Sequence, residues 1–93
     1  MNLEIAYSKS ALSFIDKNQD TLTRDESDTL IIKAVKKIYK LSIESVDLKA
    51  LKGEKSVYRI RKGSIRIIFG LNKNGNISVA SVNNIDFRGG VYK

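Results

Sequence analysis

The sequence lacks two residue types that often carry protein chemistry. Its 93 residues include no cysteine and no histidine. Without cysteine, neither disulfide bonds nor thiolate metal sites can form. Without histidine, the usual general base near neutral pH and the commonest metal ligand are both missing. We therefore expect no metal and no cofactor, and a reducing cytoplasmic compartment is the default.

Long hydrophobic runs and proline are absent as well. No stretch of about 18 apolar residues occurs, so we expect no membrane span and no membrane partner. The start, MNLEIAYSKSAL, has no basic segment followed by an apolar block, the pattern that is typical of a secretory signal. An apolar content of 42% in a chain of this length predicts one globular domain over residues 1–93.

Acidic residues are scarce in the later part of the chain. The whole sequence has 17 lysines and arginines against 10 acids, a net charge of +7. The first 32 residues carry three basic and six acidic side chains, whereas the rest carries fourteen basic and four acidic ones. By charge alone, an excess of this size favours an anionic partner such as nucleic acid, an acidic protein or a membrane surface, and of these we expect the first two. The plain alternative is a solvated basic surface that keeps the protein soluble.

The N-terminal part predicts one strand and two helices. Residues 3–7 alternate weakly and indicate a short strand, and the next segment, SKSALSFIDKN, indicates a short helix with Ala11, Leu12, Phe14 and Ile15 on one face. A second helix begins with a capping box, in which Thr23 is the N-cap and Glu26 stands three residues later. Its apolar residues recur at spacings of three and four, which predicts a helix packed on one side: Leu30, Ile31, Ala34, Val35, Ile38 and Leu41.

The C-terminal part predicts three strands after a possible helical turn around 48–51. We expect strands at 57–62, at 65–71 and from 77 to 83 or slightly beyond. A tight turn at Gly63 and a hairpin signal, Asn74-Gly75, separate them. The order strand, helix, helix and three-strand meander predicts an α+β fold, with two helices against a small, mostly antiparallel twisted sheet.

The segment VYRIRKGSIRIIFG places basic residues within the sheet. Side chains alternate across a strand, so Arg59 and Arg61 share one face, and Arg66 lies opposite the apolar side of its own strand. We expect these three arginines to meet on the exposed face of the sheet. No acid occurs between Tyr58 and Gly70. Arginines that repel one another without acids favour an external anion, and guanidinium suits phosphate. The alternative is that arginine is an ordinary occupant of a polar sheet face.

Lysines supply a second set of candidate contacts to an anionic partner. Four of them lie on the second predicted helix, and three lie in or close to the arginine strands. Such residues contact phosphates, although a solvated helix face is the other interpretation of the first four. The candidates are Lys33, Lys36, Lys37, Lys40, Lys52, Lys55 and Lys62.

The segment from Leu48 to Lys93 resembles a known family. The run LKG ahead of YRIRKGSIRIIF, then a turn, a strand and a terminal RGGVYK, is similar to the second half of the RelE/ParE superfamily of toxins from bacterial type II toxin–antitoxin modules. The resemblance implies a compact toxin that a cognate antitoxin wraps and inhibits. In the RelE-like branch, it implies entry into the ribosomal A site, contact of the candidate lysines with ribosomal RNA, and cleavage of mRNA.

The same resemblance implies a catalytic set of Arg59, Arg61, Arg66, Arg88 and Tyr92. RelE-like members carry lysines where this chain has its first two arginines. Arginine, with a pKa of about 12.5 or above, accepts protons poorly, so the general base stays open. Asp86 is a candidate base, but we favour its pairing with Arg88.

Two other functions remain open. A ParE-like toxin would bind DNA gyrase and cut nothing, which agrees with the missing histidine. A degenerate member would only hold its antitoxin. The arginine cluster and the terminal tyrosine favour a metal-independent mRNA endonuclease.

Overall fold

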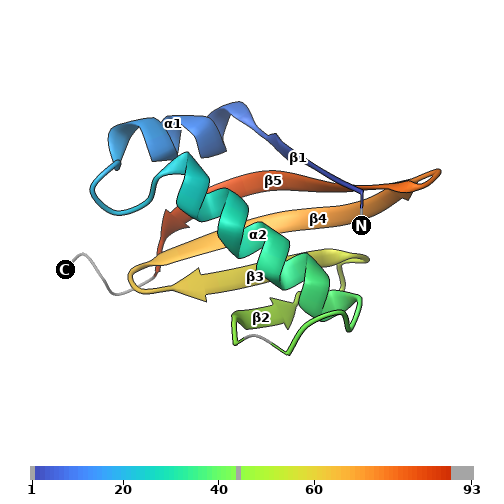
Figure 1. Cartoon of the computed structure of the whole chain (residues 1–93). Coiled ribbons are helices and arrows are strands. Elements are labelled where there is room, and N and C mark those ends of the chain that lie inside the picture. The colour runs from blue at the N-terminus through green and yellow to red at the C-terminus, as the bar shows by residue number, and fades with distance from the viewer. Residues whose placement is uncertain (1, 44, 89–93) are drawn as a thin grey trace.

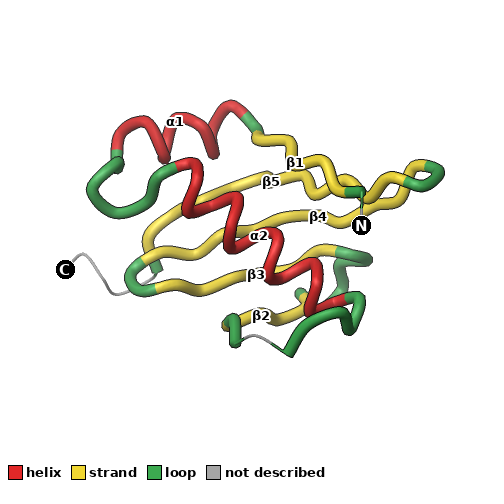
Figure 2. Tube along the Cα trace, in the orientation of Figure 1, coloured by secondary structure: helices red, strands yellow, loops and turns green. Residues whose placement is uncertain are grey.

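The computed structural model describes residues 2–43 and 45–88. It contains an open five-stranded sheet with two helices on one of its faces (Figure 1). Figure 2 shows the same layers by secondary structure. The elements, in chain order, are β1 (Leu3–Tyr7), α1 (Lys9–Lys17), α2 (Arg24–Ile38), β2 (Asp47–Ala50), β3 (Val57–Lys62), β4 (Ile65–Asn74) and β5 (Ile77–Phe87).

The sheet confirms the predicted α+β architecture and adds one strand to it. Its order is β1-β5-β4-β3-β2, in which β1 runs parallel to β5 and every other neighbouring pair is antiparallel. The helical turn predicted around 48–51 is wrong, because Asp47–Ala50 forms β2 at the edge of the sheet. Leu48 pairs with Ile60 and packs against the core, so the segment alternates as a strand does.

The two long strands extend beyond their predicted ends. β4 continues to Asn74 and β5 to Phe87, and Gly75 and Asn76 form the loop between them. Gly75 has a φ of 65°, the left-handed conformation that glycine adopts without strain. The register shifts between Ile68 and Phe69, which indicates a β-bulge in this pair of strands.

The second helix begins where its capping box predicts, and the first begins after a serine cap that was not predicted from the sequence. Ser8 caps α1, and both hydrogen bonds of the Thr23–Glu26 capping box are present at the start of α2. Two apolar assignments are wrong: Leu12 is 38% exposed and Leu41 is 62% exposed. Leu41 lies beyond the end of α2 at Ile38. Within the described residues, neither helix is long and apolar enough to cross a membrane.

The core lies between the helices and one face of the sheet. α2 runs diagonally across this face (Figure 1), and it buries Ile31, Ala34 and Val35. The buried apolar side chains of the strands that meet this layer are Ile60, Ile65, Ile67, Phe69, Leu71, Ala80, Val82 and Ile85. In the described part of the chain, the opposite face carries no helix, so polar side chains on that face can form a site.

Candidate functional site: a basic hollow on the open face of the sheet

The register of β3 and β4 brings the three predicted arginines together. Arg61 pairs with Arg66 and Arg59 pairs with Ile68, and directly opposed residues share a face of an antiparallel sheet. A hollow of about 430 Å³ opens on this face. We call it the arginine hollow; its lining residues are Lys49, Ala50, Leu51, Lys52, Arg59, Arg61 and Arg66.

The prediction that this cluster contains no acid is wrong. Asp47 lies 3.4 Å from Arg59 Nη2, and Asp86 accepts two hydrogen bonds from Arg66, at 3.1 Å from Nε and 2.9 Å from Nη2. Asp47 comes from β2 and Asp86 from β5, the strands that flank β3 and β4. The arginine segment itself is free of acids, but its neighbours in the sheet supply two.

The predicted pair between Asp86 and Arg88 does not form. Asp86 stands opposite Arg66 in the β4–β5 ladder, which places the carboxylate beside that guanidinium. Arg88 instead donates from Nη1 to the carbonyl oxygen of Gly63 at 2.9 Å, and its backbone N–H donates to Ser64. Arg88 therefore tethers the end of β5 to the β3–β4 turn.

Arg59 is buried, although it was predicted on an exposed face. Only 7% of Arg59 is accessible. The end of β2 and the two residues that follow β2 line the hollow beside Arg59. Its Nε has no hydrogen-bond partner among the described residues. Arg61, next along the same face, is exposed. The hollow therefore combines a buried guanidinium with an accessible one.

The seven candidate lysines do not form one surface. Lys52 lines the arginine hollow, whereas Lys33 and Lys62 line a separate hollow of about 290 Å³ along α2. Lys37 Nζ donates to the carbonyl oxygen of Val46 at 3.1 Å. Of the remaining three, Lys36 lines a further hollow with Leu3, Ile5 and Ile32, Lys40 follows α2, and Lys55 is exposed in the β2–β3 turn.

Two residues beside the arginines were not predicted from the sequence: Lys49, which lines the arginine hollow, and Asp47, which pairs with Arg59. Asp47 and Lys49 face the arginines only because the chain around them forms a strand. The alternation of Asp47, Leu48 and Lys49 was the available signal, and it is too short to separate a strand from a turn. Tyr92, the last member of the predicted catalytic set, lies outside the described residues.

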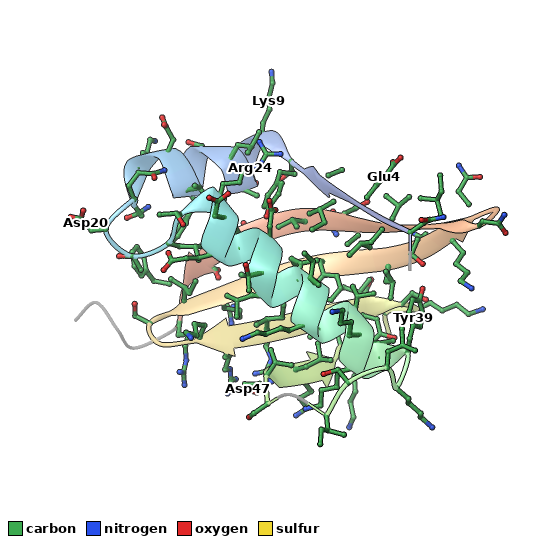
Figure 3. All side chains as sticks on the ribbon, in the orientation of Figure 1. Glu4, Lys9, Asp20, Arg24, Tyr39 and Asp47 are labelled. Carbon is green, nitrogen blue, oxygen red and sulfur yellow. The ribbon has the colours of Figure 1, made fainter. Side chains whose placement is uncertain are left out.

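A second polar cluster joins β1 to α2. The Tyr7 hydroxyl donates to Asp28 Oδ1 at 2.6 Å and lies 2.8 Å from Ser27 Oγ. Burial, and then the hydrogen bond to Asp28, raise the pKa of Tyr7 well above its ordinary value. Arg24 lies over the Tyr7 ring, 4.9 Å from its centre. Arg24 and Asp47 lie at opposite edges of the molecule (Figure 3), so this cluster is separate from the arginine hollow.

Comparisons of sequence find no match, but comparisons of structure do. No family model and no curated protein matches the chain. A YoeB/ParE toxin from Agrobacterium tumefaciens is 15% identical, covers 95% of this chain and 99% of its own, and has a TM-score of 0.60. A mutant of YafQ from E. coli is 12% identical, covers 99% and 100%, and has a TM-score of 0.62.

An archaeal complex agrees with these two. A chain of the RelE–RelB complex from Pyrococcus horikoshii OT3 is 18% identical, covers 96% of this chain and 98% of its own, and has a TM-score of 0.60. At these identities, the likeness establishes the fold. The protein has the RelE/ParE-type toxin fold, as the resemblance of its C-terminal half implied.

Proposed function

We propose that the protein is the toxin of a type II toxin–antitoxin module and acts as a ribosome-dependent mRNA endonuclease that inhibits translation. The observation that carries this proposal is the arginine hollow, where three arginines and two lysines gather on the open face of a RelE/ParE-type fold. Further support comes from two solved relatives of the same fold, which are RelE–RelB complexes.

The proposed chemistry is attack by the RNA 2′-oxygen on the adjacent phosphorus, which forms a 2′,3′-cyclic phosphate and breaks the bond to the 5′-oxygen; the hydroxyl proton passes to water, and the leaving 5′-oxygen takes up a proton. Arg59, Arg61 and Arg66 bind that phosphate and neutralise the charge that grows on its non-bridging oxygens. Donors held in place before the reaction stabilise such charge strongly. The two hydrogen bonds from Arg66 to Asp86 support this role, because they hold the guanidinium in one orientation. The three guanidinium and two ammonium groups that line the hollow repel a metal cation, so we propose a metal-independent reaction.

We assign proton transfer to groups other than the three arginines of the hollow. Arginine is a poor proton acceptor, and the Asp86 carboxylate is occupied by Arg66. Tyr92 remains our candidate to donate a proton to the leaving oxygen or to stack on a base. Ribosomal RNA and the mRNA itself can supply further positioning, which is why we propose a ribosome-dependent enzyme.

The proposed partners follow from charge. A protein with a net charge of +7 suits an acidic, amphipathic antitoxin in the cytoplasm. Such an antitoxin would be encoded by a small reading frame directly upstream or downstream. On the ribosome, the lysines of α2 and of the β2–β3 turn would contact ribosomal RNA through its phosphates.

A ParE-like gyrase inhibitor is the second candidate. The observation that favours it is the pairing of Arg59 and Arg66 with aspartates, so that both carboxylates beside the arginines in the described part of the chain are engaged in ion pairs. A degenerate member that only holds its antitoxin would share this feature. Neither alternative gives a reason for the gathering of basic residues around one hollow.

An in vitro translation assay with primer extension, run beside a gyrase supercoiling assay, tests these functions. Cuts in codon register that appear only when ribosomes are present would support the endonuclease. Inhibition of gyrase with intact mRNA would rule it out and favour the ParE-like function. Neither effect, together with tight binding of the antitoxin, would indicate the degenerate member.

A further inference from the structure

The ion pair between Arg59 and Asp47 is strongly asymmetric. The Arg59 side chain is 9% exposed, whereas the Asp47 side chain is 58% exposed. Their closest atoms, Nη2 and Oδ1, lie 3.4 Å apart, and Arg59 Nε is buried with no partner in the described residues. The buried Arg59 therefore depends for its neutralisation on Asp47, whose carboxylate makes one long contact with it.

The physical consequence differs for the two side chains. A buried guanidinium is stabilised only when its charge and its N–H groups are matched, and charge-assisted hydrogen bonds are typically about 2.7–2.9 Å long. The contact to Asp47 is longer than this. An exposed carboxylate loses little free energy when its side chain rotates into the solvent, because water already solvates most of it. An anion that approached more closely would satisfy Arg59 better than Asp47 does.

The position of Asp47 in the fold makes such an exchange simple. Asp47 is the first residue of β2, a four-residue strand at the edge of the sheet with β3 as its sheet neighbour. Its side chain can therefore turn away without disturbing an inner strand. The Arg66–Asp86 pair differs, because it has two contacts of 2.9 and 3.1 Å between two inner strands.

We propose that Asp47 is a replaceable counter-ion that competes with an RNA phosphate for Arg59, and thereby keeps the affinity of the arginine hollow for free RNA low. The proposal rests on the proposed function for the identity of its ligand. RNA that is positioned by the ribosome displaces Asp47, whereas loose RNA has to compete with it. Asp47 is thus an affinity-setting residue and touches no reacting atom.

Binding of a single-stranded oligoribonucleotide without ribosomes tests the proposal. Fluorescence anisotropy of the full chain over a salt series would compare the wild type with Asp47→Asn, which removes the charge and keeps the shape. We expect Asp47→Asn to bind about fivefold more tightly at low salt, the size of one partly exposed charge pair. The plot of the logarithm of the association constant against the logarithm of the salt concentration should steepen by about 0.7. This is the change in slope that one further phosphate contact causes on a single strand.

Glu54→Gln is the matched control. It removes the same charge from an exposed position in the β2–β3 turn, and Glu54 does not line the arginine hollow. We expect its affinity and slope to stay near those of the wild type. An equal gain in both variants would mean that net charge alone sets the affinity, and no gain in Asp47→Asn would exclude competition; either result overturns the proposal.

A measurement on the wild type covers the case in which Asp47→Asn does not fold. Inorganic phosphate would be titrated into the labelled protein while the Arg59 Nε–H signal is followed by NMR. Burial protects this proton from exchange with water, which makes the signal observable. We expect phosphate to shift it in a saturable way. If phosphate shifted the Arg61 or Arg66 signals and left the Arg59 signal unchanged, the replacement of Asp47 by phosphate at Arg59 would be refuted.

The two proposals fail in different ways. Suppose that the wild type cuts mRNA on ribosomes and Asp47→Asn gains no affinity for free RNA. The proposal that phosphate replaces Asp47 at Arg59 is then wrong, and the proposed endonuclease function stands. If Asp47→Asn gains affinity beyond Glu54→Gln and no mRNA is cut, the endonuclease is wrong and Asp47 remains the competitor of an anion at Arg59.

Discussion

The two faces of strands β3 and β4 differ in almost every physical respect. On the helix side, Ile60, Ile65, Ile67 and Phe69 are each at most 1% exposed and fill the core. On the open side, the same strands present the arginines of the hollow, with partners from the flanking strands. Because side chains alternate, one stretch of backbone serves both faces, and each face can change while the other is kept.

The faces also differ in how completely their groups are satisfied. Apolar side chains on the helix side are enclosed by other apolar side chains, which is their most stable environment. On the open side, Arg59 combines burial with an Nε that has no partner in the described part of the chain. Groups that break the usual rules of polar satisfaction concentrate at functional sites. The contrast therefore supports our proposal that one face provides stability and the other binds the ligand.

The largest expected effect is on the helix side. Phe69→Ala removes a fully buried ring that stacks on Tyr58 with 5.6 Å between ring centres. We expect the free energy of unfolding to fall by about 3–5 kcal/mol in urea titrations. Ile68→Ala, one residue away on the open face and only partly buried, should cost about 1 kcal/mol. Equal losses would show that the two faces do not divide as described.

The next effect is on activity. Arg66→Ala should slow mRNA cleavage on ribosomes by about a hundredfold and abolish toxicity, because it removes a donor to the phosphate. The free energy of unfolding should change by no more than about 1 kcal/mol, since the lost ion pair is partly exposed. Growth inhibition, cleavage and antitoxin binding would be measured together.

Lys73→Ala is the control for that variant. It removes one positive charge from the far end of β4, where Lys73 lies over the Tyr39 ring. Its cleavage rate should resemble that of the wild type. Full toxicity of Arg66→Ala would remove this residue from the site, and equal defects in both variants would indicate a general effect of charge.

A smaller effect concerns the Tyr7 cluster on the helix side of β1. The folded state raises the pKa of Tyr7 above its ordinary value of 10.0. Above pH 10 the folded protein therefore keeps a hydroxyl proton that the unfolded chain loses, and the free energy of unfolding falls as pH rises. Below pH 10 this contribution is fully present. Tyr7→Phe should remove that part of the pH dependence, measured by urea unfolding over a pH series; an unchanged slope would contradict the assignment.

The smallest effect is at the end of α2. Lys40 has a φ of 60°, a left-handed conformation that strains most residues after a helix. Lys40→Gly should raise the free energy of unfolding by about 1 kcal/mol, because glycine suits this position. Lys36→Gly, the same change inside the helix, should lower it by about 1 kcal/mol. Thermal and urea unfolding would check both signs, and a loss at Lys40 would show that its side chain matters more than its backbone.

Much of the fold could be predicted because its signals are local. The bounds of β1 and β3, the capping box of α2 and the glycine turns follow from short sequence patterns. β2 could not be predicted in this way. Its four residues become a strand only by pairing with β3, since a lone strand of this length is not stable in water.

The sequence by itself determined which side chains share a face, because alternation is a property of the extended backbone alone. It therefore predicted that Arg59, Arg61 and Arg66 converge, and they do. Only the tertiary structure decided what meets them. Asp47 stands 12 residues from Arg59 and Asp86 stands 20 residues from Arg66, so their contacts depend on strand order and register. Packing of the whole sheet sets the strand order and the register. These in turn decide the burial of Arg59 and the charge balance of the hollow.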